Sequence, residues 1–141
     1  MSQRSQNVIA AITLLICMSF NSWSLALAQG TYGVASFYTP PYVPSKCNGF
    51  ADDGVWIAAA NADLFDGGAA CGRYYWVICT GGTNLGTPHP CKNKWVKVKI
   101  VELCPSCKQR HIALDLSNEA FAYIADPASG LIQVYYQPIR V

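Results

Sequence analysis

The sequence predicts a small, mainly β domain of about six short strands and one helix, stapled by three disulfides. Runs rich in Val, Ile, Tyr and Trp recur along residues 29–141, separated by segments rich in Gly, Pro, Asn and Thr. Six of the seven cysteines lie in the same region, which is typical of a small exported domain. The region is long enough for one hydrophobic core but not for two. Together these observations favour a small β-barrel.

Residues 1–28 have the pattern of a secretory signal peptide. Arg4 precedes an uncharged apolar run at 8–20, and Ala26-Leu27-Ala28 matches the pattern at which signal peptidase cleaves. The run is short for a membrane span, which needs roughly 20 apolar residues. An uncleaved anchor is the alternative. We expect cleavage directly after the tripeptide, export to the extracellular space, and no membrane span in the mature chain.

The strands are predicted from β-branched and aromatic runs that end in turn-forming residues. They are expected at residues 31–38, 55–60, 74–78, 94–103, 111–115 and 132–137. A Pro-rich loop at 39–46 and a Gly-containing turn at 63–70 separate the first three strands.

The strand at 94–103 is the clearest, because its side chains alternate with a period of two. One face holds Val96, Val98 and Ile100. The opposite face, which we expect to be solvated, holds Trp95, Lys97 and Lys99. The same alternation places Glu102 on the apolar face, which is unusual for a charge.

One helix is predicted at residues 117–125. Ser117 is a natural N-cap, Glu119 suits the first helical turn, and Pro127 prevents continuation. Apolar residues recur at helical spacing, at Leu116, Ala120, Phe121 and Ile124.

Six cysteines allow many connectivities, but their spacing narrows the choice. One pair brackets a loop rich in Gly, Pro and Thr between two predicted strands, and a second pair flanks the preceding loop region. The third spans a Pro-containing turn, which is short but feasible if the Cα atoms lie within about 7 Å. In that order, the expected pairs are Cys79–Cys91, Cys47–Cys71 and Cys104–Cys107.

Cys104-Pro-Ser-Cys107 also resembles a thioredoxin-type redox site, in which the first cysteine lies at a helix N-terminus. No apolar helical period follows it and no βαβ pattern surrounds it, so a structural bridge is favoured. His89 and His111 lie at no recognised ligand spacing, and a disulfide-bonded cysteine cannot bind zinc. We therefore expect neither a metal site nor a cofactor.

The charge balance gives no sign of a nucleic-acid partner. The whole chain has a formal net charge of +2, and no strong basic patch stands out. We expect a monomer. A set of aromatic residues could form a stacking surface on the barrel, although aromatic residues at strand spacing are more often core. The set comprises Tyr32, Tyr38, Tyr42, Trp56, Tyr74, Tyr75, Trp76 and Trp95.

Four motifs in series carry a resemblance to a known family. They are ASFYTPPY at 35–42, GAACGRYY at 68–75, VKIVELC at 98–104 and LDLSNEAF at 114–121. The series resembles the plant natriuretic peptides, also called endoglucanase-45-like domain proteins, which are related to the first domain of expansins and to barwin. The resemblance covers nearly all of residues 29–141. It implies a six-stranded double-psi β-barrel in the apoplast, and it supports the Cys47–Cys71 pair.

The resemblance also implies candidate groove residues. In related wall-acting enzymes an Asp in a motif like Leu114-Asp115-Leu116 serves as the acid, and Glu102 matches an Asp that lines the same groove in expansins. Inverting glycosidases need two carboxyl groups, and residues 36–39, where the related endoglucanases carry the second one, contain none. We therefore expect no enzyme activity. As an alternative, Asp115 could accept backbone N–H groups at the helix start.

The function that the resemblance implies is extracellular signalling in water and solute homeostasis, through an unidentified cell-surface receptor. The family's signalling stretch matches residues 58–79, within which Asp63, Arg73, Tyr74 and Tyr75 are the candidate contacts. Two alternatives remain open. The first is an expansin-like protein that binds or loosens wall polysaccharide through the groove, and the second is a barwin-like defence protein.

Overall fold

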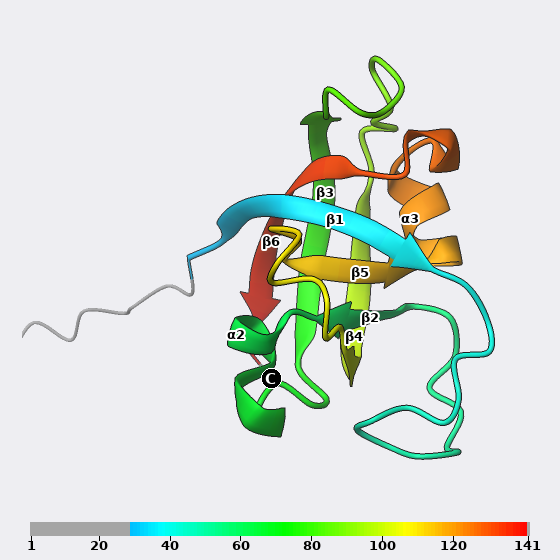
Figure 1. Cartoon of the computed structure of the whole chain (residues 1–141), viewed down its shortest axis with the longest axis vertical. Helices are drawn as coiled ribbons and strands as arrows, with labels where there is room; N and C mark the ends of the chain where they lie inside the picture. Colours follow the sequence, from blue (N-terminus) through cyan, green and yellow to red (C-terminus); the bar gives the residue numbers. More distant parts are fainter. Residues whose placement is uncertain (1–28, 141) are drawn as a thin grey trace, which may run out of the picture.

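The computed structural model describes residues 29–140. The predicted signal peptide, at 1–28, lies outside the described residues. Six strands close into one barrel in the order β1-β5-β2-β4-β3-β6 (Figure 1). The strands are β1 Thr31–Tyr38, β2 Ile57–Ala60, β3 Tyr74–Gly82, β4 Trp95–Leu103, β5 Leu114–Ser117 and β6 Ile132–Ile139. The prediction of a six-stranded barrel is confirmed.

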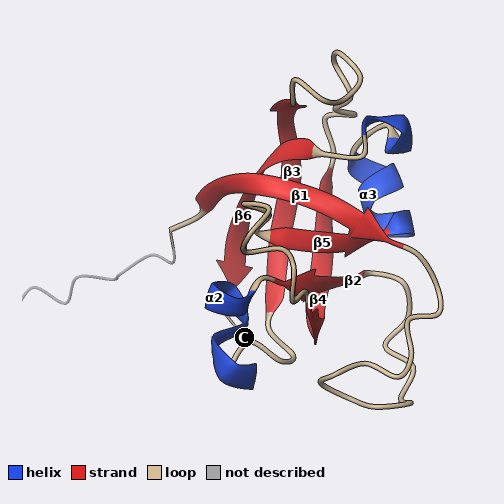
Figure 2. Ribbon diagram, viewed as in Figure 1, coloured by secondary structure: helices blue, strands red, loops and turns tan. Residues whose placement is uncertain are grey.

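The barrel contains both parallel and antiparallel strand pairs. The β1–β5 and β2–β4 pairs are parallel, whereas the other four pairs are antiparallel. Each parallel pair needs a long crossover connection, and these crossovers supply the loops that cover the barrel. Figure 2 shows the barrel strands in red, with the helical segments lying at two separate corners of the molecule.

The helices differ in part from the sequence prediction. Helix α3, Asn118–Ile124, is the expected one, and the Ser117 hydroxyl accepts the Ala120 backbone N–H at 3.1 Å as its N-cap. A second helix, α2 at Ala62–Phe65, lies where a turn was expected. It forms because the Asn61 side chain accepts the Leu64 N–H at 2.9 Å, a capping interaction available to few residue types. Two 3-10 turns, Asp66–Gly68 and Pro127–Ser129, complete the helical elements.

The expected strand at 111–115 is shifted in the structure. Residues up to Ala113 belong to the loop after β4, and β5 runs to Ser117, which also caps α3. Ala113 N–H bonds to the Val34 carbonyl, and the Ala113 carbonyl accepts from Asn61 N–H. These tertiary bonds, rather than local propensity, set where β5 begins. Within the described residues, no helix is long and apolar enough to cross a membrane.

The main core fills the barrel and the space under α3. Phe121 is fully buried and stacks at 4.9 Å, between ring centroids, on Phe37 of β1. The other fully buried side chains include Val77, Val98, Ile100, Leu114, Leu116, Ile124, Ile132 and Val134. A second, smaller cluster comprises Ala59, Cys104, Cys107 and Ile112, against which Val34 and Tyr38 pack.

The three predicted disulfide pairs are confirmed. Cys47–Cys71 ties the long loop at 39–56 to the turn before β3, and Cys79–Cys91 closes the base of the β3–β4 hairpin. Cys104–Cys107 closes the turn after β4. Each bridge therefore ties down a loop that connects named elements of the fold.

A bulge in β4 overturns the expected orientation of Glu102. Ala58 of β2 pairs with Ile100, but the next residue, Ala59, pairs with Glu102, so the register shifts by one at Val101. One extra residue reverses which face the following side chains point to. Glu102 therefore shares the outer face with Ala59. The predicted alternation of inward and outward side chains in residues 94–103 therefore holds only as far as Ile100.

Candidate functional site

Across the outer face of the barrel, four paired positions form a row. Ser36 of β1 pairs with Asp115 of β5, Asp115 pairs with Ala59 of β2, and Ala59 pairs with Glu102 of β4. Residues that are directly paired in neighbouring strands project to the same face. The β4 bulge thus brings the two predicted groove carboxylates onto one surface. We call Ser36, Asp115, Ala59 and Glu102 the carboxylate row.

Asp115 is the half-buried centre of this row. The Ser36 hydroxyl donates to its Oδ1 at 2.6 Å. Burial raises the pKa of Asp115, while the Ser36 hydrogen bond and the positive charge of Arg110 oppose the rise. The alternative role at the helix start is not what the structure shows, because Ser117 provides the cap of α3. A carboxyl group that retains its proton to higher pH can donate as well as accept a hydrogen bond.

The raised pKa of Asp115 predicts a pH-dependent stability difference from Asp115→Asn. Above the ordinary carboxyl pKa of about 3.9, folded Asp115 binds more protons than unfolded Asp115. The free energy of unfolding of the wild type therefore falls as pH rises from the ordinary to the raised pKa. The Asn side chain keeps the acceptor for Ser36 but does not titrate. Urea unfolding of both proteins between pH 3 and 7 should show the variant gaining stability relative to the wild type as pH rises.

Subtracting the free energies of unfolding of the two proteins at each pH cancels the contributions of the other titrating groups. Asp53, whose pKa the Lys99 hydrogen bond lowers, acts in the opposite direction but equally in both proteins. The exposed Asp66, changed to Asn, is the matched control for an Asp-to-Asn change outside the row. A difference between wild type and Asp115→Asn that stays constant over the whole pH range would contradict the prediction.

Tyr38 places an unsatisfied hydroxyl beside the row. Its side-chain oxygen is buried and has no hydrogen-bond partner within residues 29–140. Burial, followed by the negative charges of Glu102 and Asp115, raises the pKa of Tyr38 above its ordinary range. Its ring packs edge-on against Tyr42, with centroids 5.2 Å apart. A buried hydroxyl without a partner is costly, and a polar ligand would supply the missing bond.

The other two carboxylates nearby are occupied by structural bonds. Glu102 accepts the backbone N–H of Lys46 at 3.1 Å and that of Leu103 at 3.0 Å. Glu119 accepts the hydroxyl of Tyr42, and burial together with this bond raises the pKa of Tyr42 to about 12. Both carboxylates thus anchor the loop at 39–56. The β1 position paired with Asp115 holds Ser36 rather than a carboxylate.

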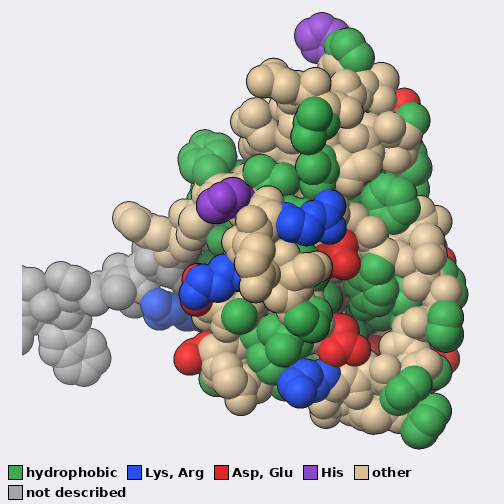
Figure 3. Space-filling view, viewed as in Figure 1, with side chains coloured by type: hydrophobic (Ala, Val, Ile, Leu, Met, Phe, Trp, Pro, Cys, Tyr) green, Lys and Arg blue, Asp and Glu red, His purple; other side chains and the backbone are tan. Residues whose placement is uncertain are grey.

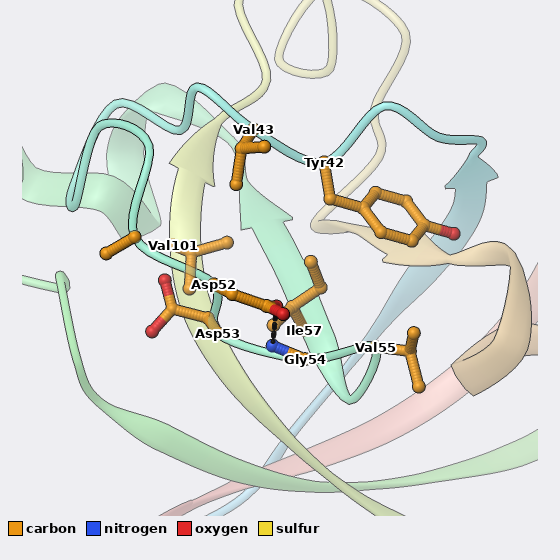
Figure 4. A pocket seen from close by; sticks show the side chains of 9 residues that line it. Tyr42, Val43, Asp52, Asp53, Gly54, Val55, Ile57 and Val101 are labelled. Atoms are coloured by element: carbon orange, nitrogen blue, oxygen red, sulfur yellow. Dashed lines mark hydrogen bonds between the residues drawn. The ribbon is translucent and has the colours of Figure 1, made fainter.

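A pocket of about 340 Å³ lies between the loop at 39–56 and the barrel (Figure 4). Its apolar side chains include Val43, Val55, Ile57 and Val101, and the loop contributes Ala51, Asp52, Asp53 and Gly54. Asp52 Oδ1 accepts the Gly54 N–H at 2.8 Å, the bond drawn in the figure. Tyr42 lies at the rim with its hydroxyl turned away. Through Tyr42 and Tyr38 this pocket adjoins the carboxylate row.

The Cys104–Cys107 bridge lies next to Asp115, with sulfur and carboxylate atoms all within 4.8 Å of one another. Because the two sulfurs are bonded together, they have no thiolate to offer a metal ion. Cys107 is fully buried and Cys104 nearly so, as is usual for an inert structural bridge. The bridge belongs to the second core cluster beneath the loop at 104–113.

The four candidate receptor contacts do not share one environment. Asp63 is exposed on α2 and pairs with Lys108 at 2.8 Å, and Arg73 is exposed in the turn before β3. Tyr74 is half-buried beneath the Lys97 ammonium, 4.7 Å from its ring centroid. Tyr75 lies in the core, only 4% exposed. A receptor could therefore meet the first three side chains, but Tyr75 faces the barrel interior.

The sequence analysis did not assign Ser36, Tyr38 and Tyr42 to the site. A signal was available for two of them, because Ser36 and Tyr38 lie two apart in a predicted strand and so share a face. What the sequence lacked was the pairing of that strand with β5. In Figure 3, viewed from the side of β1 and β5, acidic and basic side chains are interspersed with hydrophobic ones.

Comparisons with known proteins point to one group. The family model described as lytic transglycolase matches residues 57–136. An EG45-like domain containing protein of Citrus jambhiri is 48% identical over 92% of this chain and 93% of its own length. Expansin-B4 of Arabidopsis thaliana is 28% identical over 96% of this chain and 58% of its own length.

A solved structure with the same fold comes from a bacterium. It is a mutant expansin of Clavibacter michiganensis in complex with cellohexaose, with a TM-score of 0.62 and 24% identity. The match covers 79% of this chain and 51% of that one. At this identity the likeness establishes the barrel fold alone.

Proposed function

The chain belongs to the EG45-like domain proteins, and on that premise we propose that it is an extracellular protein that binds a cell-wall polysaccharide over the carboxylate row without hydrolysing it. The observation that carries the proposal is the half-buried Asp115 beside the partnerless hydroxyl of Tyr38. A sugar hydroxyl both donates and accepts hydrogen bonds, so one hydroxyl could satisfy both groups. The expansin that shares this double-psi β-barrel was solved with cellohexaose.

The same geometry argues against glycoside hydrolysis. Hydrolysis with inversion needs a general base besides the acid, and Glu102 and Glu119 are already occupied by loop-anchoring bonds. The strand position next to Asp115 carries Ser36 instead. Asp115 is therefore proposed as a binding residue. Burial raises the pKa of Asp115, so this carboxyl group keeps its donating proton to a higher pH than an ordinary one does.

Retention on insoluble cellulose and xylan tests the proposal. We expect the wild type to be retained and to release no reducing sugar. Tyr38→Phe should weaken retention roughly fivefold, because it removes one hydrogen bond worth about 1 kcal/mol. Asp115→Asn should weaken it by roughly tenfold. Asp66→Asn and Tyr32→Phe, which make the same chemical changes outside the row, should bind as the wild type does.

Two results would overturn this function. Sugar release by the wild type would show an enzyme, and full retention by both row variants would place the polysaccharide elsewhere. Signalling in water and solute homeostasis stays a prediction, and it would be favoured if wall-free protoplasts swelled while no wall glucan was retained. The exposed Asp63 and Arg73 would then be the first contacts to change. Inhibition of fungal growth would favour the barwin-like defence role instead.

A further inference from the structure

A second surface lies around the barrel from the carboxylate row, on the outer side of β3, β4 and β6. Three paired positions cross it at mid-height: Lys97 of β4, Trp76 of β3 and Gln137 of β6. The next row along the strands contains Trp95, Ile78, Tyr135 and Tyr32. The outer face of these strands thus presents a layer of aromatic side chains to solvent, whereas their inner face packs into the core.

Large aromatic rings on this surface are about half exposed. The exposed fractions are 43% for Trp76, 45% for Trp95, 48% for Trp56 and 43% for Tyr123. Trp56 contacts Tyr123 with ring centroids 5.6 Å apart, and Trp95 contacts Tyr135 at 6.1 Å. These edge-to-face contacts hold the rings in place. Contiguous exposed apolar surface of this kind marks an interaction site.

Trp95 stands between two depressions on this surface. One, of about 370 Å³, is lined by Trp76, Trp95 and Gln137. The other, of about 270 Å³, is lined by Trp56, Trp95, Val96, Lys97 and Tyr123. Because Trp95 lines both, the two depressions are neighbours on one face of the barrel, and each has aromatic side chains in its wall. We call these seven residues the aromatic trough.

The charged side chains at the aromatic trough are two lysines, Lys94 and Lys97. Lys97 lines it and lies 4.7 Å from the ring centroid of Tyr74, and Lys94 lies 5.0 Å from that of Tyr123. Neither depression is lined by an acidic residue, and the strands β3 and β6 contain none. Cores of protein–protein interfaces are depleted in lysine, so a lysine in the wall of the trough favours a different class of partner.

We propose that the aromatic trough binds a linear acidic polysaccharide, a chain of uronate sugars. The flat C–H face of each sugar ring would pack on an indole or phenol ring, as apolar surfaces do on aromatic faces. The carboxylates of the same sugars would meet the ammonium groups of Lys94 and Lys97. Two neighbouring depressions suit successive sugars of one linear chain. The proposal is independent of the carboxylate row, where the nearby acidic groups would repel a polyuronate.

Titration with an oligogalacturonate, followed by tryptophan fluorescence at low and high salt, tests the proposal. Trp76→Ala should weaken binding roughly tenfold, because it removes an aromatic wall of the larger of the two depressions. Lys97→Gln should weaken it roughly threefold at low salt and have little effect at high salt, where surface charges are screened. Leu85→Ala, which removes an exposed apolar side chain that does not line the trough, should bind as the wild type does.

Three outcomes would overturn the proposal. Equal, salt-independent binding of cellohexaose and oligogalacturonate would mean that charge plays no part. Loss of binding in Asp115→Asn with retention in Trp76→Ala would move the acidic chain to the carboxylate row. Self-association of the wild type that Trp76→Ala abolishes, without uronate binding, would make the trough an interface between copies. Lys97→Gln changes an exposed residue, so it keeps the test valid if Trp76→Ala fails to fold.

Discussion

Replacing Phe121 with alanine is expected to lower the free energy of unfolding by about 3–5 kcal/mol. The Phe121 ring is fully buried and stacks on Phe37. Together with Ala120 and Ile124 it forms the buried face of α3, which closes one end of the core. Alanine would leave a cavity that the barrel strands, held by hydrogen bonds on both sides, cannot collapse to fill.

Urea unfolding of the protein measures this loss. Phe50→Ala is the matched control, because the Phe50 ring is 82% exposed, and we expect it to change stability by less than about 0.5 kcal/mol. If Phe121→Ala cost no more than Phe50→Ala, α3 would not be packed against the barrel. Because Phe37 lies between Ser36 and Tyr38 in β1, polysaccharide binding at the carboxylate row should also weaken in the Phe121 variant.

Removing the Cys47–Cys71 bridge is the second change with a large expected effect. The bridge spans 24 residues, and the loop-entropy model gives a loss of about 3.5 kcal/mol for a loop of that length. We expect the double variant Cys47→Ser, Cys71→Ser to lose that much stability. The double change avoids leaving a lone thiol that could pair wrongly.

The bridge also holds the loop at 39–56 over the barrel. The Cys47 N–H bonds to the Val101 carbonyl at 3.0 Å, and the next residue back, Lys46, donates its N–H to Glu102. Loosening the loop would release Tyr42 from beside Tyr38. The double variant should therefore bind polysaccharide at the carboxylate row more weakly even below its unfolding temperature.

Removing the Cys104–Cys107 bridge is the comparison for this experiment. That bridge spans only three residues, and the same model gives a smaller loss of about 2 kcal/mol. Thermal unfolding should therefore show a larger loss of stability for Cys47→Ser, Cys71→Ser than for Cys104→Ser, Cys107→Ser. Equal losses, or a larger loss for the short bridge, would show that strain or residual structure in the unfolded chain dominates over loop length.

Two surfaces of one small barrel thus have different chemistry. The carboxylate row combines Asp115, Ser36 and the partnerless Tyr38 hydroxyl, which suit neutral sugar hydroxyls. The aromatic trough combines half-exposed indoles with lysines, which suit acidic sugar rings. Because the two share no residue, variants of one should leave the other unchanged. A protein with both could contact two wall polymers at once.

The sequence alone predicted the elements whose signals are local. The alternation of apolar and polar side chains in residues 94–103 located β4 to within one residue. Ser117 and Pro127 predicted the two ends of α3, because helix capping and termination depend on neighbouring residues. Cysteine spacing and turn composition predicted all three bridges. Cys79–Cys91 and Cys104–Cys107 each close a loop between consecutive strands, whereas Cys47–Cys71 spans β2 and α2 and was supported by the family resemblance as well. The short helix α2 was missed because four residues carry too little periodicity to distinguish from a turn.

What the tertiary structure decided is where those elements place their side chains. Asp115 and Glu102 could be named from motifs, but their common surface depends on one inserted residue at Val101, which strand alternation cannot reveal. The role of Ser36 depends on β1 lying beside β5, a pairing between residues 79 positions apart in the chain. Likewise, Trp76 and Trp95 are exposed while Tyr75 is buried. Local sequence determines which residues alternate, but only the closed barrel determines which side is the inside.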